Sequence, residues 1–265
     1  MEMTLACLRS LYSQQGMEAI DLTVYLVDDG STDGTCDAVA ANFAEVRLLH
    51  GNKQLYWNGG MRMAFTEAMR EDFDAYLWLN DDSIFFNDAI KRMITCYEEV
   101  ARQGVEAIIA GSMMDPKTRT RSYGGYRAQR KWLRFDWIPV PPDENRALSC
   151  DTMNGNLVLI PAAVAKKVGN LDATFRHQIG DLDYGLRARK AGVSVLIAPK
   201  YFGECTDNSR EGTWMDRTLS RRKRWANLMS PKGAPPREWL LFTWRHYGWR
   251  WPLYAISPYL KTLVG

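Results

Sequence analysis

The sequence predicts an α/β protein with a mostly parallel central sheet. Short apolar segments that suit buried strands alternate with amphipathic segments that suit helices. The loops that join them are short, as in βαβ units with right-handed crossovers. Several apolar segments run directly into acidic loops, and ligands bind at the carboxyl ends of strands in open α/β sheets. These three observations indicate the fold class and the sheet edge at which a site is expected.

The first half of the chain follows this alternation. Leu5, Leu8 and Leu11 share one face of a helix, so the pattern opens with a helix. The expected elements are helix 3–13, strand 22–27, helix 36–43, strand 46–49, helix 61–71, strand 76–79, helix 88–102 and strand 107–111. Residues 51–60 are expected to form a loop, although Gly59 and Gly60 at its end also suit the start of a helix.

The second half of the chain departs from the alternation. Residues 115–142 are basic, aromatic and rich in Gly and Pro, which favours a hairpin or an irregular excursion over one face. The expected elements that follow are strand 151–160, a short helix beginning at Pro161, helix 181–191 and strand 193–198. From residue 208 the chain is basic and rich in tryptophan, with two or three helices broken at prolines. We therefore expect one domain over residues 1–207 and a helical extension over 208–265.

Composition excludes several functional classes. Hydrophobic residues make up 46% and charged residues 25%, as in ordinary soluble globular proteins. The net charge of +3 is too small to predict nucleic-acid binding. The five cysteines are scattered without a CxxC pair, which favours a reducing compartment and argues against a zinc site. We find no signal peptide and no apolar run near the ~18 residues of a membrane span, so we expect a cytoplasmic location.

Two adjacent carboxylates follow the apolar strand 76–79. Asp81 and Asp82 must lie where the strand ends, because burying two unpaired carboxylates costs several kcal/mol or more. Oxygen ligands of this kind suit a hard divalent cation that also bridges to phosphate. The alternative is a solvated turn that caps the next helix, since Asp is common in turns.

Two more acidic clusters occupy comparable positions. Asp28 and Asp29 end the second apolar segment beside Gly30, where carboxylates can bind a ribose or a base edge. Asp181 and Asp183 lie in the first turn of a helix, where the helix dipole favours anions and a carboxylate can serve as a general base. A turn and a helix cap are the respective alternatives. Three such clusters in one α/β chain favour a shared site.

The order of five motifs resembles that of the inverting family 2 glycosyltransferases with the A-type fold. The motifs are VDDGSTDGT, WNGGMRMAF, LWLNDDS, NGNLVLIP and GDLDYGLRARKAG, and the resemblance covers roughly residues 3–205. It implies a Rossmann-like nucleotide-diphospho-sugar transferase fold for the catalytic domain. It also implies metal-assisted transfer of a sugar, with inversion, from a nucleotide-diphosphate-sugar to a hydroxyl of a glycan or lipid-linked acceptor. Such enzymes act in polysaccharide or glycolipid synthesis for the cell envelope.

The resemblance also assigns roles to residues. Asp181 would be the catalytic base, and Asp82, in the DxD-like motif, would bind Mg²⁺ or Mn²⁺. The residues expected to contact the nucleotide sugar are Asp28, Asp29, Asn58, Gly59 and Asp81. The weaker candidates for acceptor contact or support are Trp57, Asn154, His177 and Asp183. Of these, Asp183 is expected to pair with Arg187, four residues later on the same helix.

The sequence departs from the family pattern at several positions. Asn80 stands for the first Asp of the DxD signature, and Gly180 stands for a Glu beside the catalytic Asp. Residues 201–205 contain no metal-binding His, although Glu204 or Cys205 could substitute for it. The usual first strand and the loop after it are missing. We expect this loss to leave two neighbouring strands unpaired, with their backbone groups exposed.

These departures keep other functions open. A non-catalytic member that binds sugar or nucleotide is the first alternative. A nucleotidyltransferase is the second, although it would need a glycine-rich, basic triphosphate loop near the N-terminus. The WNGG and NDDS variants resemble those of rhamnosyl- and galactofuranosyl-type members. Basic and aromatic residues in the C-terminal extension favour peripheral contact with the inner face of a membrane, with packing on the catalytic domain or a dimer contact as the alternatives.

Overall fold

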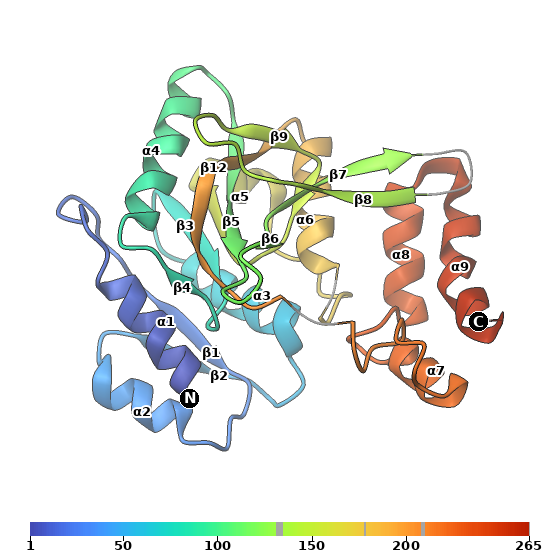
Figure 1. The fold of residues 1–265 in the computed structure, drawn as a ribbon. Coiled ribbons are helices and arrows are strands. Elements are labelled where there is room, and N and C mark those ends of the chain that lie inside the picture. Colours follow the sequence, from blue (N-terminus) through green and yellow to red (C-terminus); the bar gives the residue numbers. More distant parts are fainter. Residues whose placement is uncertain (131–134, 178, 208–209, 265) are drawn as a thin grey trace.

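The computed structural model describes residues 1–130, 135–177, 179–207 and 210–264 (Figure 1). A central sheet lies between helices, and the last three helices gather at one end of the molecule. The first two helices and the first two strands gather at the opposite end. The predicted α/β class and the helical C-terminal appendage are thus confirmed.

The first half of the chain has the predicted order of elements. They are α1 (Glu2–Tyr12), β1 (Tyr25–Asp28), α2 (Thr35–Asn42), β2 (Arg47–His50), α3 (Tyr56–Ala68), β3 (Ala75–Leu79), β4 (Ile84–Phe85), α4 (Ala89–Arg102) and β5 (Ala107–Met114). The main difference is at α3, which begins at Tyr56 and includes the predicted loop residues 57–60. Its first backbone N–H groups are satisfied by Asp29, which is distant in sequence, so local pattern could not reveal this start.

The second half contains the predicted hairpin and three C-terminal helices. The elements are β6 (Arg121–Tyr123), β7 (Gly125–Arg130), β8 (Phe135–Val140), β9 (Leu148–Cys150), β10 (Thr152–Met153), β11 (Leu157–Pro161), α5 (Ala162–Val168), α6 (Gly180–Lys190), β12 (Ser194–Glu204), α7 (Arg221–Met229), α8 (Pro236–His246), a 3₁₀ turn η1 (Gly248–Arg250) and α9 (Trp251–Val264). Strands β7 and β8 pair antiparallel, as a hairpin requires. The division of the chain at residue 207 remains a prediction.

The central sheet is mixed, which corrects the expectation that it is mostly parallel. Its path is β3-β11-β5-β12-β4. Strand β12 runs parallel to β5, whereas β11 runs antiparallel to both β3 and β5. The principal strands β3, β5 and β12 therefore share one direction, and β11 is reversed between them. The reason is the connection from β5 to β11, which consists of short strands and contains no crossover helix.

Strands β1 and β2 form a separate parallel pair in the described structure. Strand β3 pairs only with β11, so one edge of β3 and one edge of β1 lack a described strand partner. A single cavity of about 710 Å³ is lined by residues of both strands, including Leu26 and Leu77. Such unpaired edges on two strands were expected from the sequence. The groove between them is continuous with the candidate site.

Apolar side chains cover both faces of the central sheet. On one face, Trp78 and Tyr184 belong to a cluster in which strand residues pack against α3, α5 and α6. On the other face, Met93 and Phe202 belong to a cluster with α4 and α1. Full burial of such a side chain contributes about 1.5–3 kcal/mol. These two layers hold the carboxyl ends of β3 and the start of α6 in fixed positions.

The C-terminal helices pack against the rest of the protein through α8. Arg245 donates to Asp183 at 2.7 Å and to Asp172 at 2.8 Å. Nε2 of His246 lies 2.8 Å from the same Asp183 oxygen that Arg245 contacts. An aromatic cluster that includes Phe242 and Phe175 fills the contact. One face of the appendage is therefore anchored on α6, as one of the sequence-based alternatives proposed.

Candidate functional site

The three acidic clusters converge on one cavity. This cavity, of about 710 Å³, lies between the β1–β2 pair, the end of β3, and the first turns of α3 and α6. The predicted site residues that line it are Asp29, Trp57, Asp81, Asp82, Asn154, His177 and Asp181. Their roles remain predictions, but their shared position is a finding. It arises because β1 and β3 both end at this cavity and α6 begins there.

Asp29 has one carboxylate oxygen without a hydrogen-bond partner among the described residues. Its Oδ2 accepts the backbone N–H groups of Leu55 at 2.7 Å and Tyr56 at 3.2 Å, at the start of α3. Its Oδ1 is buried and has no hydrogen-bond partner among the described residues. A buried acceptor without a partner costs about 1–3 kcal/mol. A hydroxyl or N–H donor of a bound ligand would remove that cost.

Asn80 holds Trp57 at the cavity wall. The indole Nε1–H of Trp57 donates to Asn80 Oδ1 at 2.7 Å. The Trp57 ring also lies in the space next to Gly155 that a larger residue would need. The neighbouring Asp81 accepts a hydrogen bond from the Thr4 hydroxyl at 2.7 Å. Asn80, which replaces an acidic residue of the family signature, therefore positions an aromatic side chain.

Asp82 lies beside Cys205. The Cys205 thiol donates to Asp82 Oδ1 at 3.5 Å. Partial burial of the carboxylate, together with the charge of Asp81, raises the pKa of Asp82. Glu204, the other possible replacement for the missing His, instead forms an ion pair with Arg119. Of the two candidates, the structure places Cys205 next to Asp82.

The donor set at Asp81 and Asp82 fits a hard divalent cation. Neither carboxylate forms an ion pair within the described part of the chain, and each lines the cavity. Partial burial is the main cause of the raised pKa of Asp82, and repulsion from the charge of Asp81 adds to it. A cation would remove this repulsion. Carboxylate oxygens suit Mg²⁺ or Mn²⁺, and a thiolate from Cys205 would be a softer ligand than either ion prefers.

Asp181 is a half-buried carboxylate at the start of α6. Its Oδ2 accepts the backbone N–H of Gly155 at 3.0 Å, and its Oδ1 accepts that of Leu182 at 2.8 Å. Burial raises the pKa of Asp181, and these bonds, with one from the Asn154 side chain, oppose the rise only partly. A carboxylate with a raised pKa at a cavity wall is suited to accept a proton near neutral pH.

His177 lies opposite the start of α3. Its Nδ1 is 3.5 Å from the backbone N of Trp57, and its ring meets the edge of the Tyr56 ring. Burial and the nearby Lys232 lower the pKa of His177, so the neutral imidazole predominates at pH 7. A neutral ring can donate to or accept from a ligand, but it supplies no charge to a phosphate.

Four predicted site residues do not line the cavity. Asn58 is fully buried and donates to the backbone oxygens of Asp172 at 3.1 Å and Phe175 at 2.6 Å. Gly59 lies inside α3, packed on its own helix, because that helix begins earlier than predicted. Asp28 is not among the residues that line the cavity, and Asp183 is buried beneath α8 with Arg245 and its predicted partner Arg187. The roles predicted for these four residues stay predictions.

The sequence pattern missed two residues of the first helix. Thr4 and Cys7 line the cavity, and Cys7 donates to the backbone oxygen of Asn80 at 3.4 Å. Both lie on the same face of α1 as Leu8 and Leu11. The one feature of the sequence that could have indicated them is that they interrupt the apolar face of the helix. Nothing local indicated that this stripe faces the loop after β3.

Comparisons with known proteins agree with this geometry. The sequence model described as "Glycosyltransferase like family 2" matches residues 2–227. No curated protein sequence matches the chain significantly. Among solved structures, the crystal structure of S. aureus TarS has a TM-score of 0.57 and 13% identity, over 94% of this chain and 42% of that chain. The crystal structure of GalNAc-T7 with UDP, GalNAc and Mn²⁺ has a TM-score of 0.54 and 11% identity, over 74% of this chain and 39% of that chain.

These structural relatives establish the fold alone, since their identities are low and this chain spans well under half of either one. Both have the A-type glycosyltransferase fold that the order of motifs predicted. The family match covers most of the chain and includes every acidic residue of the cavity. The chain therefore belongs to glycosyltransferase-like family 2.

Proposed function

We propose that this protein transfers a sugar from a nucleotide-diphosphate-sugar to a hydroxyl acceptor, with inversion at the anomeric carbon. The observation that carries this proposal is Asp181, a carboxylate with a raised pKa that lines the same cavity as Asp29 and Asp82. A base on one side of a cavity and nucleotide-binding carboxylates on another provide for direct displacement.

Asp181 acts on the acceptor. Its deprotonated carboxylate takes the hydroxyl proton as the acceptor oxygen attacks the anomeric carbon. The bond from that carbon to the diphosphate oxygen breaks, and the nucleoside diphosphate leaves with the bonding electrons. Gly155 and Leu182 hold both oxygens of Asp181, which fixes its orientation before the acceptor arrives.

Asp29, Asp81 and Trp57 would bind the donor. The unpaired Oδ1 of Asp29 suits a nucleoside hydroxyl or N–H, and Trp57 offers an aromatic face for a base or a sugar. Asp82, with Asp81, would hold Mg²⁺ or Mn²⁺, which offsets negative charge on the leaving diphosphate. The fold relative GalNAc-T7 was crystallised with UDP and Mn²⁺, which supports a donor and a cation of these classes.

We further propose that the acceptor is lipid-linked and that the C-terminal helices contact a membrane surface. Apolar side chains recur along one face of α9 and just before it. They are Trp249, Leu253, Ile256, Leu260 and Leu263, each at least half exposed. The neighbouring helix α7 begins with the exposed basic residues Arg221, Arg222 and Lys223. No helix among the described residues meets the length and hydropathy of a membrane span. An exposed apolar face beside basic residues suits the interface of an anionic membrane.

A member that binds donor without transferring sugar is the competing function. The separation of β1 from β3 favours this function, because the two-stranded sheet of β1 and β2 holds a bound nucleotide less rigidly than a strand within the central sheet would. The bond from Trp57 to Asn80 also favours it, since this position supplies no carboxylate to a cation.

One assay separates these functions. The protein is incubated with UDP-, dTDP- and GDP-sugars, first with Mn²⁺ or Mg²⁺ and then with EDTA, and release of nucleoside diphosphate is measured. We expect release that requires the cation and is stimulated by an acceptor extract. Donor binding by calorimetry without any release would instead establish the non-catalytic function. When Asp181→Asn is tested in this assay, Asp74→Asn is its matched control, because Asp74 is exposed and lies outside the cavity.

A further inference from the structure

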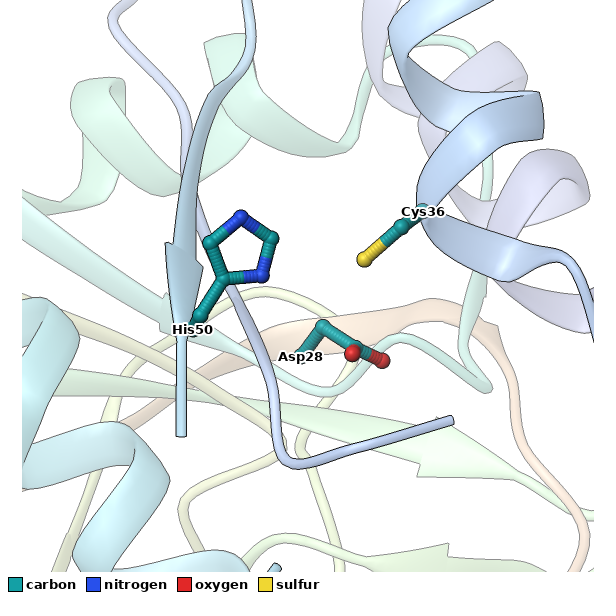
Figure 2. Close-up of side chains that lie close together, drawn as sticks. All are labelled: Asp28, Cys36 and His50. Carbon is teal, nitrogen blue, oxygen red and sulfur yellow. The ribbon is translucent and has the colours of Figure 1, made fainter. Parts of the chain in front are cut away.

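A second group of potential metal ligands lies outside the cavity. Asp28, Cys36 and His50 each offer one ligand atom, and these three atoms all lie within 4.8 Å of one another. Figure 2 shows the three side chains facing each other from β1, α2 and β2. None of the three lines the candidate site. This group, the Asp28–Cys36–His50 cluster, has no part in the sugar transfer proposed above.

The backbone brings these residues together. The parallel register of β1 and β2 pairs Asp28 directly with His50 at the carboxyl ends of both strands. Gly30 and Gly34, with φ of +88° and +80°, turn the chain back so that α2 starts beside the strand ends. Such φ values favour glycine. Cys36 is the second residue of α2 and therefore faces Asp28.

The carboxylate of Asp28 is already oriented. Its oxygens accept the backbone N–H groups of Gly30 and Ser31, each at 3.2 Å, and further lone pairs remain. The Cys36 thiol lies next to this carboxylate, while the His50 side chain is exposed and can rotate. The Asp28 carboxylate is therefore fixed, whereas the His50 side chain is free to adjust. Partial exposure also leaves room for a water molecule as a fourth ligand.

We propose that the Asp28–Cys36–His50 cluster binds Zn²⁺. One carboxylate oxygen, one thiolate and one imidazole nitrogen are ligands that zinc takes together, with water in the fourth tetrahedral position. Metal–ligand distances of about 2.0–2.3 Å place tetrahedral ligands about 3.3–3.8 Å apart, so each separation needs to shorten by no more than about 1.5 Å. The Cys36 thiol loses its proton to solvent when the ion binds. This donor set differs from the carboxylates at Asp82, which suit Mg²⁺ or Mn²⁺.

The ion would add a second link among three elements that a small apolar cluster, including Val39 and Leu26, already joins. An isolated two-stranded sheet is marginally stable, and β1 and β2 pair only with each other in the described structure. A metal between Asp28, His50 and Cys36 ties both strand ends to α2. The next residue, Asp29, lines the cavity, so the same ion would steady that wall. The scattered cysteines argued against zinc in the sequence, but a site with one cysteine needs no CxxC spacing.

Cobalt substitution tests this site without any activity measurement. The full-length, metal-free protein is titrated with Co²⁺, and thiolate-to-cobalt absorption in the near ultraviolet is recorded; Zn²⁺ should then displace the cobalt. We expect this absorption in the wild type and its loss in Cys36→Ser. His50→Ala, a change of an exposed side chain, should weaken Co²⁺ binding at least about tenfold. The melting temperature should rise with Zn²⁺ in the wild type and not in Cys36→Ser.

Cys205→Ser is the matched control, because Cys205 is the thiol beside Asp82. It should keep the cobalt–thiolate absorption. The proposal is overturned if no thiolate absorption develops, or if it is lost in Cys205→Ser and kept in Cys36→Ser. None of these readouts depends on sugar transfer, so the zinc site and the proposed function can fail separately.

Discussion

The side chain of Asn58 fills the space in which a Cβ atom on Gly180 would lie. Asn58 is held there by hydrogen bonds to the backbone of residues 172 and 175. Gly180 begins α6 and precedes Asp181. The buried amide of Asn58 and the absence of a side chain at Gly180 therefore depend on each other. Asn58 thus leaves no room for a side chain at position 180.

A side chain at position 180 should destabilise the protein. We expect Gly180→Ala to lower the free energy of unfolding by about 1–3 kcal/mol, because the new methyl group overlaps the Asn58 amide. Denaturation in urea measures this change. Gly60→Ala is the control, since its added Cβ would meet Val27 at 3.8 Å, an ordinary contact. Unchanged stability in Gly180→Ala would show that Asn58 moves aside without cost.

Removal of the Asp181 carboxylate should stop transfer and spare donor binding. We expect Asp181→Asn to lower kcat by about 10²–10⁴-fold, the range for loss of a general base. The amide oxygen can still accept one of the two N–H groups, that of Gly155 or that of Leu182, so the fold should persist. Calorimetry with the nucleotide sugar checks binding, and circular dichroism checks folding. An equal loss of donor affinity would assign Asp181 to the donor or to structure.

On the acid side of the pH–rate profile, the rate should fall at a pH above the usual pKa of a carboxylate. Asp181 acts as a base only when deprotonated, and burial raises its pKa. As pH falls through this raised pKa, the base is lost and kcat decreases. The profile of kcat is measured at saturating donor and Mn²⁺, because the pKa of Asp82 is also raised and cation binding weakens in acid. A limb near pH 4, the usual value for carboxylates, would contradict this role.

The position of the acidic residues was predictable, whereas their surroundings were not. Asp29, Asp82 and Asp181 follow or begin regular elements with clear local patterns, and ligands bind at such ends. The reversed direction of β11 was not predictable, because its apolar run carries no information about direction. Asn58 was expected in a loop, because the start of α3 depends on Asp29, which lies 26 residues before Leu55. The Asp28–Cys36–His50 cluster depends on strand register, which no single segment reveals.

The contact between α8 and α6 should be a major source of stability for the appendage. Asp183 is fully buried, and it accepts hydrogen bonds from Arg245 and Arg187. We expect Arg245→Met to cost about 3 kcal/mol, because the carboxylate then loses a partner while it stays buried. Arg237→Met, an exposed change on the same helix, should have little effect on unfolding in urea. Equal stability of both variants would show that the aromatic cluster alone holds α8.

Membrane contact should depend on the exposed face of α9 and on the basic start of α7. We expect the protein to float with anionic vesicles in a density gradient, and to float less with neutral vesicles or at high salt, since salt screens the basic residues. The triple variant Trp249→Ser, Leu253→Ser, Ile256→Ser should stay in the dense fraction. Each of these side chains is more than half exposed, so their replacement should leave folding intact.

Ile138→Ser is the control for this experiment, because Ile138 is an exposed apolar residue on β8, outside the appendage. It should float as the wild type does. If the wild type stays in the dense fraction with every vesicle composition, the apolar face of α9 does not bind membranes. Concentration-dependent sedimentation of the wild type, absent in the triple variant, would then assign this face to a contact between two copies of the chain.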